Sequence, residues 1–258
     1  VVLVPLGRRE REDVDGRAGI RFTVSTWRTP IFEIEMPVLG AHQARNAAVA
    51  IAAVEVLRES GAVSVTDDAI VAALRDVELP ARMEIVASSP LTIVDTAHND
   101  GSSHAAGEAL ALHFPNREAV VCFGCAKDKD AGQIAMGFLP FVREWVLTRA
   151  PSPRAAEPED LVDELPDPTQ RVTIERDPLE AVRLATGLAG PRGMVLVIGS
   201  FYLAGAVRER LIARGAGPWR ELRCKQGRGR AVGGAVEITP PAPAVRRRDR
   251  GGGAAGNP

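Results

Sequence analysis

The feature of this sequence that most constrains its fold is a regular alternation of short apolar runs and helical stretches between residues 91 and 213. Apolar runs of strand length that are separated by helices are typical of a mostly parallel sheet with helices on both faces. We therefore predict an α/β fold with a doubly wound sheet. The predicted strands are residues 91–95, 119–123, 144–148, 172–175 and 194–198, and the predicted helices are residues 103–114, 133–142, 158–165, 179–188 and 203–213.

The preceding part of the chain has a different pattern and predicts a separate unit. Residues 20–24 and 31–35 alternate apolar and other side chains, as half-buried strands do. Residues 43–60 are Ala-rich and apolar around nearly the whole helical circumference, which predicts a buried helix. A second, amphipathic helix is expected to begin after an N-cap at Thr66 and to end before Pro80 interrupts the pattern.

The net charge of −1 hides an uneven distribution. Residues 216–258 hold nine Lys and Arg against three Asp and Glu, are rich in Gly and Pro, and lack periodicity, so we expect a disordered tail. The mildly acidic remainder lacks the basic stripe of a nucleic-acid-binding domain. No apolar run reaches about 18 residues, the length of a membrane-spanning helix. We therefore expect neither a nucleic acid nor a membrane as a partner.

Three cysteines do not make a disulfide framework, so the expected location is a reducing cytoplasm. Two of them, Cys122 and Cys125, have the C-x-x-C spacing of redox and zinc sites. Cys122, however, lies inside an apolar strand, and a zinc site would need two more ligands nearby. We therefore expect a buried, inert thiol there and assign no metal ligands.

Polar side chains follow several predicted strands, at the sheet edge where ligands bind in open α/β folds. Asp95 could accept hydrogen bonds from ribose hydroxyls, or Asp95 or Asn99 could cap the following helix. Lys129 lies in a loop that could bind an acidic substrate or be solvated. Ser200 could cap the last helix or touch a ligand. Arg82, beside the predicted hinge, could bind phosphate oxygens or be a surface charge.

Together these segments resemble the folylpolyglutamate synthase/dihydrofolate synthase family, within the Mur-ligase-type ATP-dependent amide ligases. The resemblance spans residues 22–213. The Gln at position 43 resembles the residue found in the folate branch of the family. The family usually has Pro-Gly-Arg where this chain has Pro80-Ala81-Arg82, and Ala fits there if its backbone is not left-handed. The matching motifs are residues 39–48, 80–84, 95–99, 124 with 128–130, and 199–203.

The resemblance implies a domain organisation. Residues 1–80 would be the end of a Mur-ligase central ATPase domain, and residues 81–215 would be the Rossmann-like C-terminal domain. Residues 216–258 would be the disordered tail. The chain has no initiator Met and no G-x-x-x-x-G-K-[ST] phosphate loop, so we expect it to be the C-terminal portion of a longer ligase.

The resemblance also implies roles for individual residues. Asn46 would contact the adenine, Asp95 would hold the ribose, and Arg82 would approach the ATP phosphates. We expect these three side chains to converge around one nucleotide.

Three further roles follow from the same resemblance. His98 would order the nucleotide or the incoming amino acid, which makes it a catalytic candidate together with Arg82. Lys129 and Ser200 would border the glutamate pocket.

The implied reaction joins L-glutamate to dihydropteroate or folate through an acyl phosphate. ATP and Mg²⁺ would be required, and the metal ligands would lie in an N-terminal part that this chain lacks. We expect a monomer that is inactive alone. Two alternatives remain at this point: a related Mur-type ligase acting on another carboxylate substrate, and a non-catalytic nucleotide-binding module.

Overall fold

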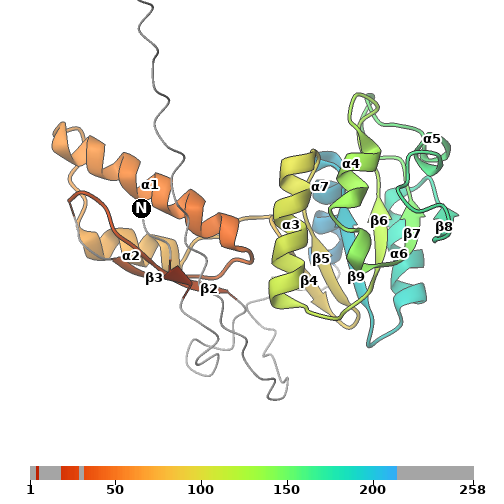
Figure 1. The fold of residues 1–258 in the computed structure, drawn as a ribbon, viewed down its shortest axis with the longest axis horizontal. Coiled ribbons are helices and arrows are strands. Elements are labelled where there is room, and N and C mark those ends of the chain that lie inside the picture. Colours follow the sequence, from red (N-terminus) through yellow and green to blue (C-terminus); the bar gives the residue numbers. More distant parts are fainter. Residues whose placement is uncertain (1–3, 6–18, 29–31, 214–258) are drawn as a thin grey trace, which may run out of the picture.

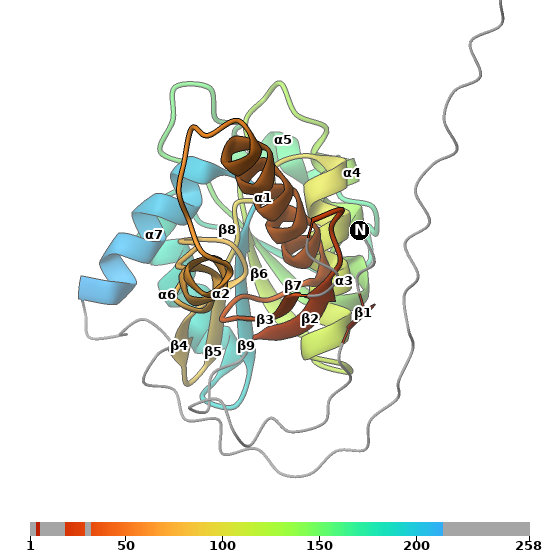
Figure 2. The same cartoon turned by 90° about the vertical axis from the view of Figure 1, so that its left-hand side faces the viewer.

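The computed structural model describes residues 4–5, 19–28 and 32–213. Figure 1 shows two bodies, each with its own sheet, and Figure 2 shows the same molecule turned by 90°. The predicted tail, residues 216–258, lies outside the described residues.

The first sheet is antiparallel and has three strands in the order β1-β2-β3. Alternating burial along β2 and β3 gives this sheet one apolar face, and the helices α1 and α2 cover that face. Thr66 caps α2, as predicted, by accepting the N–H of Ala69 at 3.2 Å. The elements are β1 (Val4–Pro5), β2 (Ile20–Val24), β3 (Phe32–Met36), α1 (Ala41–Glu59) and α2 (Asp67–Arg75).

Helix α1 is not buried all round, which corrects the prediction made from its apolar composition. One face packs on the first sheet through residues such as Ala48 and Ile51. The opposite face exposes Val49, Val56 and Leu57, of which Val49 is 71% exposed. An apolar circumference therefore does not reveal which face of a helix is covered.

The second sheet has six strands in the order β4-β5-β9-β6-β7-β8. Every pairing is parallel except that of β4 with β5, so the predicted mostly parallel sheet is confirmed. The sequence patterns missed β4, in which Glu84 pairs with Val94 at the end of β5. The strands are β4 (Glu84–Ser88), β5 (Leu91–Val94), β6 (Ala119–Phe123), β7 (Val142–Leu147), β8 (Arg171–Ile174) and β9 (Met194–Ile198).

Helices cover both faces of this sheet, as predicted (Figure 1). Helices α3, α4 and α5 share an apolar core with one face, and α6 and α7 share a second core with the other. Strands β6 and β9 are buried along their whole length because both faces are covered. The helices are α3 (Asp100–His113), α4 (Ala131–Met136), α5 (Pro158–Val162), α6 (Pro178–Ala189) and α7 (Phe201–Ala213).

The predicted helix over residues 133–142 is wrong in its extent. Helix α4 ends at Met136, and a short 3₁₀ helix, η1 (Leu139–Phe141), follows. The break occurs at Gly137, where a Cβ atom would lie 2.7 Å from the carbonyl carbon of Ser103. Close packing of this segment on α3 therefore sets the end of the helix. In the part of the chain that the structure describes, no helix has the length and hydropathy needed to cross a bilayer.

Candidate functional site

The turn that carries Arg82 has an uncommon backbone conformation. Its neighbours Ala81 and Met83 have φ values of 53° and 50°, in the left-handed region. The condition under which Ala would replace the family's usual Gly without strain is therefore not met. Each such residue costs on the order of 1 kcal/mol and persists only when its surroundings hold it. The structure thus places Arg82 between two strained residues.

The Asp95 carboxylate is what holds one side of this turn. Its Oδ2 accepts the N–H of Met83 at 2.7 Å, and its Oδ1 accepts the N–H of Ala97 at 2.6 Å. The side chain is buried, and burial raises the pKa of Asp95 to about 6 despite these two hydrogen bonds. The Asp95 carboxylate therefore faces the interior of the body that contains the second sheet. This orientation differs from that of a carboxylate that is open to a ribose.

Arg82 and His98 do lie together, and Phe201 joins them. The guanidinium carbon of Arg82 is 5.2 Å from the ring centroid of Phe201, which is the geometry of a cation–π contact. The ring of His98 lies 4.9 Å from the same ring. Nδ1 of His98 is 3.0 Å from the carbonyl oxygen of Thr96, which can only accept, so Nδ1 is the ring atom that carries the proton, and Nε2 lies 3.5 Å from Nδ2 of Asn99.

Asn99 and Ser200 have the capping roles that were one of the alternatives for each. Asn99 accepts the N–H of Ser102 at 2.9 Å and forms a capping box at the start of α3. Ser200 is buried, and its Oγ accepts the N–H of Tyr202 at 3.1 Å at the start of α7. Both side chains thereby fix the starts of their helices, α3 and α7.

The first turns of α1 bring a second set of polar groups to the site. The side chains of His42, Gln43 and Asn46 form a chain: Nδ2 of Asn46 donates to Oε1 of Gln43, and Nε2 of Gln43 lies 3.0 Å from Nε2 of His42. Burial, followed by the positive charges of Arg45 and Arg82, lowers the pKa of His42. Asn46 is exposed, and Gln43 links it to His42, whose pKa is lowered in part by the charge of Arg82.

Two buried polar atoms at these positions have no hydrogen-bond partner: Nδ1 of His42 and Oγ1 of Thr96. Because an unpaired buried polar atom is costly, such atoms are expected where a ligand completes the hydrogen bonding. Together with the cation of Arg82 they fit an anionic, hydrogen-bonding ligand such as a nucleotide.

The loop that carries Lys129 belongs to a second cluster of charged residues. Asp128 pairs with Arg154 at 2.5 Å, and Asp130 caps α4. Within the described residues, the Lys129 ammonium makes no hydrogen bond or ion pair. The hydrogen bond to Asp128 raises the pKa of Arg154, and Tyr202, in the first turn of α7, adds to this rise, so this second cluster lies near the start of α7.

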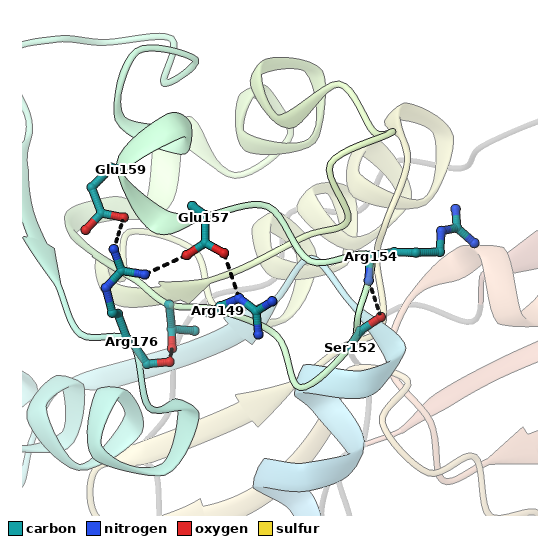
Figure 3. Close-up of polar contacts among 7 residues, drawn as sticks. Arg149, Ser152, Arg154, Glu157, Glu159 and Arg176 are labelled. Carbon is teal, nitrogen blue, oxygen red and sulfur yellow. Dashed lines mark hydrogen bonds and ion pairs between the residues drawn. The ribbon is translucent and has the colours of Figure 1, made fainter.

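Figure 3 shows the polar contacts that hold the loop after β7, which carries Arg154. Glu157 accepts from Arg149 at 2.8 Å and from Arg176 at 2.6 Å, and Arg176 pairs with a second carboxylate. The guanidinium of Arg154 extends away from this network, while its N–H donates to Oγ of Ser152. The network therefore anchors the loop and leaves Arg154 outside it.

In the described part of the chain, no group of three or more His, Cys, Asp or Glu side chains could hold a metal ion. No described residue is assigned as a magnesium ligand. Cys122 and Cys125 are buried free thiols, and burial raises the pKa of each to about 12, so the burial expected at Cys122 is confirmed.

Comparison with known proteins gives a consistent result. The family model "Mur ligase, glutamate ligase domain" matches residues 81–201. The dihydrofolate synthase/folylpolyglutamate synthase of Mycobacterium tuberculosis is 33% identical over 68% of this chain, and that of Bacillus subtilis is 27% identical over 75%. A crystal structure of the M. tuberculosis folylpolyglutamate synthase complexed with ADP and AMPPCP superposes with a TM-score of 0.67, at 29% identity over 76% of this chain.

The chain belongs to the folylpolyglutamate synthase/dihydrofolate synthase family. The resemblance expected from the sequence motifs is thereby confirmed. The chain spans less than half the length of these relatives: 39% of the M. tuberculosis sequence, 45% of the B. subtilis sequence and 45% of the crystallised chain.

The sequence motifs gave no role to Phe201 and His42, which the structure brings to the site, or to Arg154, which pairs with Asp128 in the second cluster. Phe201 and His42 are adjacent to predicted residues in motifs 199–203 and 39–48, so their positions carried a signal. Arg154 follows a strand end, which is where ligand-binding residues occur, but its loop holds no motif that sequence analysis singled out.

Proposed function

We propose that this chain forms part of an ATP-dependent carboxylate–amine ligase that adds L-glutamate to dihydropteroate or folate. One observation carries the proposal: Arg82, His98 and the polar start of α1 meet where two bodies adjoin, with two buried polar atoms left without partners. The relative whose fold matches was crystallised with ADP and AMPPCP, which supports a nucleotide as the ligand.

The domain assignment is part of the proposal. Residues 1–80 are the end of the central ATPase domain, residues 81–215 are the C-terminal domain, and residues 216–258 are an appended tail. A phosphate-binding loop and the magnesium ligands come from a part of the ligase other than this chain. The ligase works on small molecules, as a monomer, in a reducing compartment such as the cytoplasm, which suits its two buried free thiols.

The proposed reaction has two steps. The substrate carboxylate attacks the γ-phosphorus of ATP, and ADP leaves as the acyl phosphate forms. The amine of L-glutamate then attacks the acyl carbon and displaces phosphate. Because both steps depend on positioning and on neutralising phosphate charge, the protein groups mainly orient and stabilise.

Within this reaction, Arg82 neutralises phosphate charge and Asn46 contacts the adenine. Nε2 of His98 orders the nucleotide or the incoming amine. Lys129 borders the glutamate pocket with Ser200, which acts there by fixing the start of α7.

Asp95 remains part of the proposed nucleotide site. Its carboxylate acts mainly by accepting the N–H of Met83, which holds the turn that carries Arg82.

Calorimetric titration of the 258-residue chain with ADP tests the proposal. We expect binding, and we expect Arg82→Ala to weaken it by about tenfold, the loss of one charge-assisted phosphate contact. Arg171→Ala, an exposed change in the edge strand β8, serves as the control and should bind ADP like the wild type. Failure of the wild type to bind, or equal binding by Arg82→Ala, would contradict the assignment.

Activity is tested in the longer ligase. There Arg82→Ala and Asp95→Ala should both abolish glutamate-dependent ATP turnover, whereas the 258-residue chain alone should show none. Wild-type turnover in both variants, or turnover by the isolated chain, would refute the assigned roles.

A further inference from the structure

The backbone on both sides of Arg82 is held by buried carboxylates. The N–H of Ala81 donates to Oε2 of Glu84 at 2.8 Å, and the N–H of Met83 donates to Oδ2 of Asp95 at 2.7 Å. Hydrogen bonds to a carboxylate are stronger than those between neutral groups. The two left-handed residues are therefore each fixed through their own N–H.

Helix α7 supplies the countercharge of Glu84. Nε of Arg208 donates to Oε2 of Glu84 at 2.6 Å, and its Nη2 donates to Oε1 at 3.1 Å. Glu84 is only 7% exposed, and a carboxylate at that depth requires a partner. The two-pronged contact from Arg208 therefore determines where the Glu84 carboxylate lies, although the two residues are 124 positions apart in the sequence.

The same helix also contacts the other end of Arg82. Phe201, in the first turn of α7, lies under the guanidinium, and Arg208 follows about two turns later on the same helix. Helix α7 thus reaches the backbone of the turn through Arg208 and Glu84, and the charged group through Phe201.

We propose that Glu84 and Arg208 are positioning residues for Arg82. They hold the turn in the conformation that presents the guanidinium to an anionic ligand. The proposal rests on the proposed function, because that function supplies the phosphate groups that Arg82 meets. An ion pair that only stabilised the fold would change overall stability and leave both the local opening of the turn and the binding of ADP unaffected.

Amide hydrogen exchange of the 258-residue chain, measured on peptides that cover residues 79–86, tests the turn directly. The main variant is Glu84→Gln with Arg208→Met, which leaves no unpaired buried charge. We expect exchange about tenfold faster in this turn, with peptides from α3 unchanged, because only local opening is promoted. Arg208→Lys, which keeps the charge, should be intermediate. Arg210→Met, an exposed change on the same helix, should match the wild type.

Unchanged exchange at residues 79–86 in the double variant would overturn the proposal. Equal acceleration throughout the second sheet would also overturn it, because that result describes a structural ion pair.

ADP titration then separates positioning from stability. The double variant should lose as much affinity as Arg82→Ala, and adding Arg82→Ala to it should cause no further loss. Unchanged ADP affinity in the double variant, alongside a loss in Arg82→Ala, would refute positioning. If the wild type does not bind ADP, the proposed function fails, and the exchange experiment still decides whether the pair holds the turn.

Discussion

The guanidinium carbon of Arg82 lies 5.2 Å from the ring centroid of Phe201, although the two residues are far apart in the sequence. Phe201 is half-exposed, and its ring also faces His98. A single aromatic ring therefore contacts two of the side chains that were expected to act on the nucleotide, Arg82 and His98.

Replacing this ring should weaken nucleotide binding. A cation–π contact at an exposed site contributes about 0.5–1 kcal/mol, so Phe201→Leu should reduce ADP affinity by roughly twofold to fivefold. Phe201→Tyr retains the ring face and should bind ADP like the wild type. Calorimetric titration measures both, and equal affinity of the Leu variant would show that the ring does not support Arg82.

The left-handed backbone at Ala81 makes a stability prediction. Glycine has no Cβ penalty at a φ of 53°, so Ala81→Gly should raise the free energy of unfolding by up to about 1 kcal/mol. Urea denaturation measures the change. The control is Ala105→Gly within α3, where glycine should instead destabilise by about 0.5–1 kcal/mol. A loss of stability in both variants would show that Ala81 is unstrained.

Asp95 should make stability depend on pH in an unusual direction. Its pKa is raised from 3.8 to about 6, mainly by burial, so the folded state binds this proton more tightly than the unfolded state. The stabilisation is therefore complete below about pH 4 and is lost as the pH rises through 6. It amounts to roughly 3 kcal/mol, an order-of-magnitude value.

Asp95→Asn, which cannot titrate, isolates this effect. Between pH 4 and pH 8 the free energy of unfolding of the wild type should fall relative to that of the variant, as measured by urea denaturation at each pH. A difference that instead moves in favour of the wild type would mean that the N–H donors of Met83 and Ala97 outweigh burial.

Gly40 lies where α1 meets α3, and substitution there should be costly. Its N–H donates to Nε2 of His113 at 3.2 Å, its φ is 98°, and a Cβ atom would lie 2.6 Å from the ring of His42. Gly40→Ala should lower the free energy of unfolding by about 2–4 kcal/mol. Gly61→Ala is the matched control, because Gly61 has a φ of 74° with open space around it and should cost only about 1 kcal/mol. Equal losses would mean that the His42 ring moves aside freely.

The two buried thiols should be unreactive in the folded chain. In a Cys224→Ser variant, a disulfide reagent at pH 8 should modify no thiol in the native protein and two after denaturation, because burial keeps Cys122 and Cys125 protonated. Rapid modification of the native variant would show that the second sheet opens readily.

The sequence predicts the second sheet well because burial on both faces produces apolar runs, as in residues 119–123 and 194–198. Strand β4 was missed because its apolar stretch, residues 85–87, is short and lies between Glu84 and Ser88, soon after Pro80. The orientation of Asp95 could not be predicted either, since it depends on a hydrogen bond from the N–H of Met83, which lies in a turn with left-handed backbone. A single contact of this kind leaves no periodic pattern in the sequence.

The antiparallel direction of β4 has a geometric consequence for the link between the two bodies. Because Glu84 pairs with Val94, the connecting chain arrives at the rim where the parallel strands finish. Had β4 run the other way, a five-residue strand would have placed the crossing about 17 Å from that rim. A rotation of one body relative to the other would therefore pivot next to Arg82. Surfaces far from the pivot would be displaced the most, whereas the Arg82 guanidinium would change position very little.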